Sequence, residues 1–212
     1  MFKRGATGEA FRPKFTIMNP ALTQTLPAYQ TACGITDIMA HLYERYLTNT
    51  EEVEVTDRMI EGLLLTMIHE GPRVIADPDN YQARANQALA SIYGTNVMPS
   101  LGKSREWVYN VYDYIGIIRR QLGISYRETF SIIFPYWLKA EAKYHGDEIK
   151  NYMVKIWGVD ANLSEEEAVD EGSKKIIEFY ESIGLPMKYN LVAKTMPSKE
   201  QLIKATEAEY YD

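Results

Sequence analysis

Cysteine is nearly absent from this sequence of 212 residues, which contains only Cys33. A lone cysteine excludes an intrachain disulfide and any Cys-x-x-Cys metal or redox motif, and it is typical of a reducing compartment. We therefore expect a cytoplasmic protein in which Cys33 is a small buried apolar side chain rather than a nucleophile.

Positive charge and long apolar runs are also scarce. The 23 lysines and arginines are outnumbered by 29 aspartates and glutamates, which gives a formal net charge of −6. Nucleic acids and anionic membranes require a basic protein face, so we expect neither as a partner. No apolar run is long enough to span a bilayer, and the N-terminal Met1-Phe-Lys-Arg-Gly5 is too polar for a signal peptide. A glycine-rich phosphate-binding loop after a strand is missing as well.

What the sequence does contain is a succession of helical periods. Hydrophobic residues make up 46% and charged residues 25%, an ordinary globular balance. Apolar residues recur at steps of three and four along most of the chain, so we predict an all-α fold. Residues 1–26 are expected to be an arm or linker with a short extended segment, and residues 27–212 a single helical domain. We expect helices at about 27–47, 57–70, 81–93, 104–122, 125–138, 147–157, 165–183 and 198–210, with Gly71-Pro72 interrupting the second.

The stretch from Thr25 to Tyr46 is the most informative. Pro27 suits the first turn of a helix, and Thr25 is placed to cap it. One helical stripe beyond this point is apolar and consists of Ala28, Ala32, Ile35, Met39, Leu42 and Tyr46. The other side carries Gln30, Gly34, Asp37, His41 and Glu44. Asp37 and His41 thus lie one turn apart, and a carboxylate and an imidazole so placed make half of a divalent-metal site.

The same spacing has a second interpretation. A polar stripe opposite an apolar one is also the pattern of the solvated face of an amphipathic helix. The Asp–His pair would then be a surface ion pair worth roughly 0.3–0.5 kcal/mol. Spacing alone does not decide between a metal site and a solvated face.

A longer motif runs through this stretch and reads Arg12-Pro-Lys-Phe-Thr-Ile-Met-Asn-Pro-Ala-Leu-Thr-Gln-Thr-Leu-Pro-Ala-Tyr-Gln-Thr-Ala-Cys-Gly-Ile-Thr-Asp-Ile-Met-Ala-His41. Shorter motifs follow in order: Asn80-Tyr-Gln-Ala-Arg-Ala85, Phe134-Pro135, Trp157-Gly-Val159 and Ile183-Gly-Leu-Pro186. Together they resemble the iron-containing (group III) alcohol dehydrogenases, and most closely the butanol dehydrogenase branch. The resemblance covers the family's C-terminal half only. It implies the helical, metal-binding C-terminal domain of the iron-containing alcohol dehydrogenase and dehydroquinate synthase-like fold.

The resemblance implies a metal site that is incomplete here. Two of the family's four ligands to a divalent metal, iron or zinc, carry over to Asp37 and His41. The other two come from a histidine-rich interval between a Trp and a Phe-Pro, and the interval from Trp107 to Pro135 contains no histidine. Position counts place Tyr126 at the last ligand and either Asn110 or Tyr112 at the other. We therefore expect any metal to be weakly held.

Substitute ligands are few. Asp113 or a tyrosinate could coordinate, but a phenol must first lose a proton with a pKa near roughly 10, and a neutral tyrosine is a poor ligand. The aromatic cluster at residues 107–114 is more typical of helix packing. The remaining histidines, His69 and His145, stand beside turn signals and are expected on the surface.

The family's nicotinamide cofactor is held chiefly by an N-terminal nucleotide-binding domain, and this sequence is expected to begin after that domain. NAD(P) binding would then require a separate nucleotide-binding polypeptide, with Gln30 and Thr31 lining the cleft near the nicotinamide. Hydride transfer needs the nicotinamide and the substrate carbonyl in one cleft.

Three functions remain open. The first is the C-terminal part of an NAD(P)H-dependent alcohol dehydrogenase that acts on small alcohols or aldehydes, with a degenerate metal site. The second is a non-catalytic helical module for binding or homo-oligomerisation. The third is a truncated product that retains only the fold. In each case we expect the isolated chain to be inactive.

Overall fold

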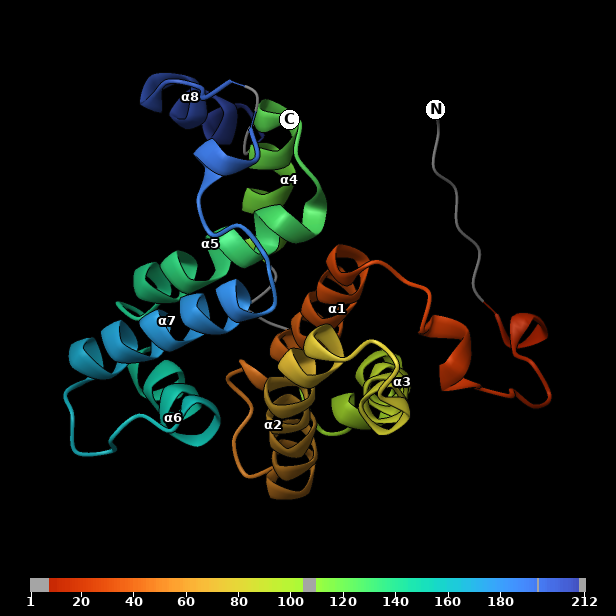
Figure 1. Ribbon diagram of the computed structural model, residues 1–212. Helices are drawn as coiled ribbons and strands as arrows, with labels where there is room; N and C mark the ends of the chain where they lie inside the picture. The colour runs from red at the N-terminus through yellow and green to blue at the C-terminus, as the bar shows by residue number, and fades with distance from the viewer. Residues whose placement is uncertain (1–7, 105–109, 194, 210–212) are drawn as a thin grey trace.

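The computed structural model of this chain describes residues 8–104, 110–193 and 195–209 (Figure 1). These residues form α-helices and short 3-10 turns and contain no β-strand, so the predicted all-α fold is confirmed. The helices are α1 (Ala28–Tyr46), α2 (Glu54–Ala76), α3 (Tyr81–Thr95), α4 (Asn110–Leu122), α5 (Tyr126–Glu141), α6 (Gly146–Trp157), α7 (Glu165–Ser182) and α8 (Lys199–Glu209).

Helix α1 lies at the centre of the fold and contacts α2, α3 and α5. Its predicted apolar stripe is buried from Ala32 to Tyr46, although Ala28 at the first turn is exposed. Burial extends well beyond that stripe, to Cys33 as expected and to the charged Glu44 and Arg45. Because so much of α1 is inside the protein, its polar side chains have fixed neighbours.

The other helices form two groups around α1. Helices α2 and α3 pack on one side, whereas α5, α6 and α7 form the other side, where α5 runs along α7 and α6 packs against α7 (Figure 1). Helix α4 packs against α5, and α8 packs against α4 at the end of the molecule far from α2 (Figure 1).

An aromatic cluster joins α1 to the group formed by α5, α6 and α7. Tyr43 of α1 stacks on Phe134 of α5 with ring centroids 4.4 Å apart. Phe134 in turn stacks on Phe130 and Trp137 at 5.1 and 5.9 Å, and Tyr152 of α6 meets Tyr43 edge-on at 5.6 Å. Each aromatic pair adds about 0.5–1.5 kcal/mol beyond its buried area, so this cluster is a principal link between α1 and the α5–α7 group.

Several helix boundaries follow from local sequence. The expected capping box of Ser125 and Glu128 starts α5, and an equivalent box of Ser164 and Glu167 starts α7. The carbonyl oxygen of the Asn80 side chain accepts from the Ala83 amide at 3.0 Å and caps α3. Gly123, where a break was expected, has φ +64°, a conformation that glycine adopts without strain.

Two local expectations are wrong. Gly71-Pro72 does not interrupt α2, which continues to Ala76. Gly71 is buried against Ile35 and Phe179, at distances where a Cβ would make only ordinary contacts. The packing of this turn of α2 compensates for the hydrogen bond that Pro72 cannot donate. Thr25 does not cap α1, because Pro27 is the capping residue and no side chain bonds there.

The N-terminal segment contains 3-10 turns at Glu9–Phe11 and Pro20–Thr23, and residues 15–18 have no regular secondary structure. The second turn lies against α3, and the Gln24 side-chain amide donates to the Asp79 carbonyl at 3.1 Å. Across the described helices, none combines the length and the apolar character that crossing a membrane requires.

The contact between α6 and α7 gives a test of the fold. A Cβ at buried Gly172 would collide with the Met153 side chain, which is itself fully buried. Gly172→Ala should therefore lower the free energy of unfolding by about 1–3 kcal/mol through overpacking. Gly62→Ala, on the exposed face of α2 with open space around it, should instead raise it by about 0.5–1 kcal/mol. Urea unfolding followed by circular dichroism measures both; a gain of stability in both variants would contradict the close helix contact.

Candidate functional site

Asp37 and His41 lie one turn apart on α1 and share one cavity. The cavity has a volume of about 360 Å³ and is bounded by α1, α3 and the turn at Pro20–Thr23. Met18, Leu26 and Ile38 give it an apolar side, and both Asp37 and His41 are partly exposed along its wall. Asp37 and His41 therefore line one cavity, and their convergence on a metal ion stays a prediction.

Asp37 is paired with an arginine that the sequence did not single out. The Arg127 guanidinium, on the first turn of α5, places Nη2 3.3 Å from Asp37 Oδ2. The two side chains are 45% and 35% exposed, so the pair contributes little to stability. It nevertheless places a cation beside the Asp37 carboxylate.

His41 turns toward Glu44 rather than toward a second ligand. Its Nδ1 lies 3.3 Å from Glu44 Oε1, and the Tyr112 hydroxyl donates to Glu44 Oε2 at 2.8 Å. Arg45 Nη1 approaches Glu44 Oε1 at 3.3 Å and also donates to the His41 carbonyl. The nearly buried Glu44 carboxylate thus has His41 and Arg45 at Oε1 and the Tyr112 hydroxyl at Oε2.

These contacts shift the pKa of both acid–base groups. Burial raises the pKa of the Glu44 carboxyl, but the hydrogen bonds from His41 and Tyr112 outweigh it, so the pKa lies below its usual value. The hydrogen bond to Glu44 raises the pKa of His41 above its ordinary value, against a smaller opposing effect of burial.

The residues at the positions of the missing histidines are held by other partners. Burial and the nearby charges of Asp37 and Glu44 raise the pKa of Tyr126 to about 12, so its phenol stays protonated at neutral pH. Its ring stacks on that of Tyr112 at 6.4 Å. Asn110 faces α5, where its side-chain amide donates to Glu141 at 3.0 Å and its carbonyl accepts from Trp137 Nε1 at 2.8 Å.

The remaining candidates do not complete a ligand set. Asp113 is exposed on the first turn of α4. His69 is 71% exposed beside Glu70, and His145 is partly exposed just before α6, which agrees with the surface positions expected for both. Over the described ranges, no three side chains of the His, Cys, Asp and Glu type converge on one point. The degenerate metal site expected from the sequence stays a prediction.

The two predicted cofactor contacts have different surroundings. Gln30 is exposed near the start of α1, whereas Thr31 is only 2% exposed and its hydroxyl accepts from Arg84 Nη1 at 3.3 Å. Arg84 is itself buried and also donates to the Pro78 carbonyl at 2.9 Å. In the sequence, Arg84 stands within the motif Asn80–Ala85 that carries part of the family resemblance, but no pattern there indicates a role for it.

The His41–Glu44 contact predicts a dependence on pH. Protonated His41 is favoured in the folded protein, so its contribution to stability is full below the unfolded pKa of roughly 6.5 and is lost as pH rises through the raised folded pKa. Because the His41 side chain is 40% exposed, this contribution should be below about 0.5 kcal/mol.

An NMR titration of the His41 imidazole tests the contact directly. Glu44→Gln should lower the pKa of His41, whereas Glu51→Gln on the exposed loop after α1 should leave it unchanged. Equal titration curves in both variants would show that Glu44 is not the partner of His41.

Comparison with known proteins agrees with this fold and with the sequence motifs. The family model for the C-terminal part of the Fe-containing alcohol dehydrogenase family matches residues 31–207. NADH-dependent butanol dehydrogenase A of Clostridium acetobutylicum is 33% identical over 189 residues, which cover 88% of this chain and 48% of that protein. NADPH-dependent aldehyde reductase YqhD of Escherichia coli is 27% identical, with the same coverage of both chains.

Solved structures show the same relationship. A substrate- and cofactor-free form of E. coli YqhD superposes with a TM-score of 0.80 at 25% identity, covering 90% of this chain and 50% of that one. Butanol dehydrogenase A from Thermotoga maritima shares the fold with a TM-score of 0.81 at 22% identity, over 95% of this chain and 50% of that one. The chain spans about half the length of the relatives it matches. It belongs to the iron-containing alcohol dehydrogenase family, and the part of that family it corresponds to is the C-terminal domain.

Proposed function

We propose that residues 27–212 act as one helical domain, the substrate side of an NAD(P)H-dependent alcohol or aldehyde oxidoreductase whose metal site is degenerate. The family membership supports the reaction class, and the names of the relatives support NADH or NADPH as the reductant and a short alcohol or aldehyde as the substrate. The cavity beside Asp37 and His41 is large enough for a short aliphatic aldehyde. The cytoplasm is the compartment that this chemistry and the single cysteine favour.

The ion pair of Asp37 and Arg127 is the observation that carries this proposal. A divalent ion bound by Asp37 would have to displace the guanidinium or sit beside it, and like charges at such distances repel. His41 does not oppose metal binding in this way, because an imidazole whose Nδ1 contacts a carboxylate can still bind a metal through its other nitrogen. A cation of the protein itself thus lies beside Asp37, one of the two residues that the resemblance predicts as metal ligands.

The nicotinamide would be supplied by a nucleotide-binding domain docked against the exposed end of α1 near Gln30. The cavity wall formed by Met18, Leu26 and Ile38 would exclude water around the substrate's alkyl chain. We expect no turnover by the isolated chain, because hydride transfer requires nicotinamide and carbonyl in one cleft.

The same ion pairs favour one alternative, a non-catalytic helical module. Asp37 and Glu44 each have an internal cationic or hydroxyl partner, so neither carboxylate requires a metal ion for its charge. A protein in which these residues are only structural would keep this arrangement and would not require a substrate.

Metal analysis tests the degenerate site. The purified wild-type chain, loaded with zinc and dialysed, should retain much less than one ion per chain. The double variant Tyr112→His/Tyr126→His adds two imidazoles beside Asp37 and Glu44. With these two further ligands a zinc ion should displace the Arg127 guanidinium from Asp37, so the variant should retain about one zinc per chain. The control Tyr81→His/Tyr93→His adds two histidines on exposed positions of α3 and should not.

The contrary result would be stoichiometric zinc in the wild-type chain that survives a chelator. His41→Ala and Asp37→Ala would then identify whether α1 holds the ion, and Asp113 and Tyr126 would be the first candidates for the ligands missed here.

Activity separates the two candidate functions. Butanal and NADH or NADPH should give no turnover with the chain alone, and addition of a nucleotide-binding domain of the same family should restore measurable reduction. Asp37→Ala and His41→Ala should each reduce the restored rate by about tenfold or more, because both side chains line the cavity. Ala88→Ser, a small change on the α3 wall of that cavity, should have a much smaller effect. If no mixture is active and both alanine variants keep their stability, the non-catalytic module is the correct function.

A further inference from the structure

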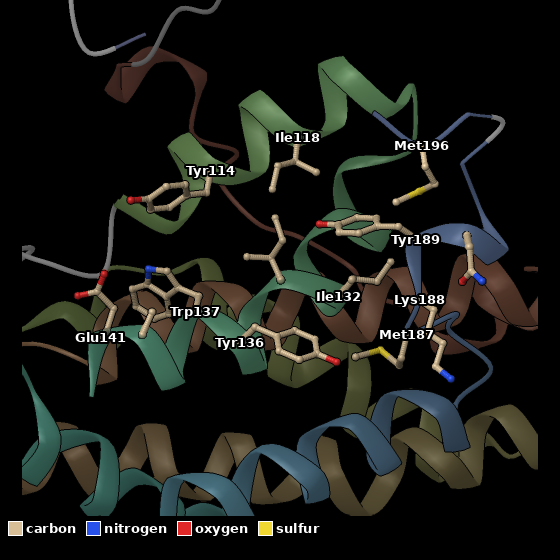
Figure 2. A pocket seen from close by; sticks show the side chains of 13 residues that line it. Tyr114, Ile118, Ile132, Tyr136, Trp137, Glu141, Met187, Lys188, Tyr189 and Met196 are labelled. Atoms are coloured by element: carbon tan, nitrogen blue, oxygen red, sulfur yellow. The ribbon is translucent and has the colours of Figure 1, made fainter. Parts of the chain in front are cut away.

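A second, larger hollow lies between α4, α5 and the segment that follows α7 (Figure 2). Its volume is about 730 Å³, within the range of about 300–1,000 Å³ that is typical of small-molecule sites. Most of its lining is apolar and includes Ile118, Ile132, Trp137, Met187 and Met196. It shares no lining residue with the cavity beside Asp37 and His41.

One polar atom inside the hollow has no partner. The Tyr189 hydroxyl is buried and forms no hydrogen bond with any described residue. Figure 2 shows the Tyr189 ring extending into the hollow between Ile118 of α4 and Ile132 of α5. Burial raises the pKa of this phenol, so it is a hydrogen-bond donor at neutral pH. An unsatisfied buried donor is destabilising, and an oxygen brought in by a ligand would satisfy it.

The charges around the hollow point to an uncharged ligand. Glu141 is the only acid among its described lining residues, and it already accepts a hydrogen bond from Asn110 at 3.0 Å. Lys188 is the only cation in that lining; it is exposed, and Figure 2 shows its side chain directed away from the Tyr189 ring. The hollow therefore offers apolar surface and, at Tyr189, a buried hydroxyl donor without a partner among the described residues. A carboxylate placed beside it would lose its hydration without a cation nearby.

We propose that this hollow binds an uncharged, mainly aliphatic molecule with one carbonyl oxygen, which accepts a hydrogen bond from Tyr189. The alkyl part lies along Ile118, Ile132 and Met196. The site is separate from the substrate cavity, so this inference extends beyond the proposed function and does not depend on it.

Calorimetric titration of the full chain with 2-nonanone tests the proposal. Wild-type protein should bind one molecule per chain. Tyr189→Phe removes only the hydroxyl and should weaken binding by about three- to tenfold without lowering the melting temperature, because the hydroxyl has no partner among the described residues to lose. Tyr144→Phe, on a side chain that is 80% exposed and outside the hollow, should change neither quantity.

A space-filling variant locates the ligand. Ile118→Trp fills the hollow from a partly exposed position and should abolish binding, whereas Ile17→Trp, at a site 84% exposed on the N-terminal segment, should not. Failure of 2-nonanone to bind the wild-type chain would overturn the proposal, as would binding that both Tyr189→Phe and Ile118→Trp leave unchanged. Tighter binding of decanoate than of 2-nonanone, lost in Lys188→Met, would also overturn it by assigning anion recognition to the rim.

Discussion

The packing of α1 against three other helices is the constraint on which the rest of this structure depends. Gln30, Asp37 and His41 stay at least partly exposed, but the polar residues that this helix buries must find partners inside the fold. Glu44 and Arg45 are nearly buried and contact each other, and Thr31 contacts Arg84. The Tyr43–Phe134 stack fixes how α5 lies along α1 and thereby where the first turn of α5 presents Arg127.

Charge compensation within the protein follows from that packing. A metal ion and an arginine can each stabilise a carboxylate, because either one supplies positive charge close to it. In this chain the positive charge comes from Arg127 at Asp37 and from Arg45 at Glu44, where His41 and the Tyr112 hydroxyl add hydrogen bonds. Under the proposed function, the substrate would contact the walls of the cavity beside Asp37 and His41 rather than a metal centre.

Local sequence predicted most of the helices but not the pairs that join them. The periodicity of α1 and the Ser125–Glu128 capping box depend on residues only a few positions apart, and both are confirmed. Gly71-Pro72 was misread because the advantage of continuing α2 comes from Ile35 and Phe179, which lie far away in the sequence. The expected pairing of Asp37 with His41 at a metal ion stays a prediction. The contact of His41 with Glu44 is an i,i+3 pair, whereas two other contacts of these residues connect positions that no spacing rule relates. Asp37 meets Arg127 across 90 residues, and Glu44 meets Tyr112 across 68.

That long sequence separation has a consequence for the order of folding. Helices α1, α2 and α3 follow one another and contact one another, so they can assemble with little loss of chain entropy. The contacts of Asp37 and Glu44 with α5 and α4 close much longer loops and form only when the second group of helices docks. The surface that carries Asp37 and His41 is then completed late in folding, and partial opening of the protein would separate its residues while α1, α2 and α3 remain together.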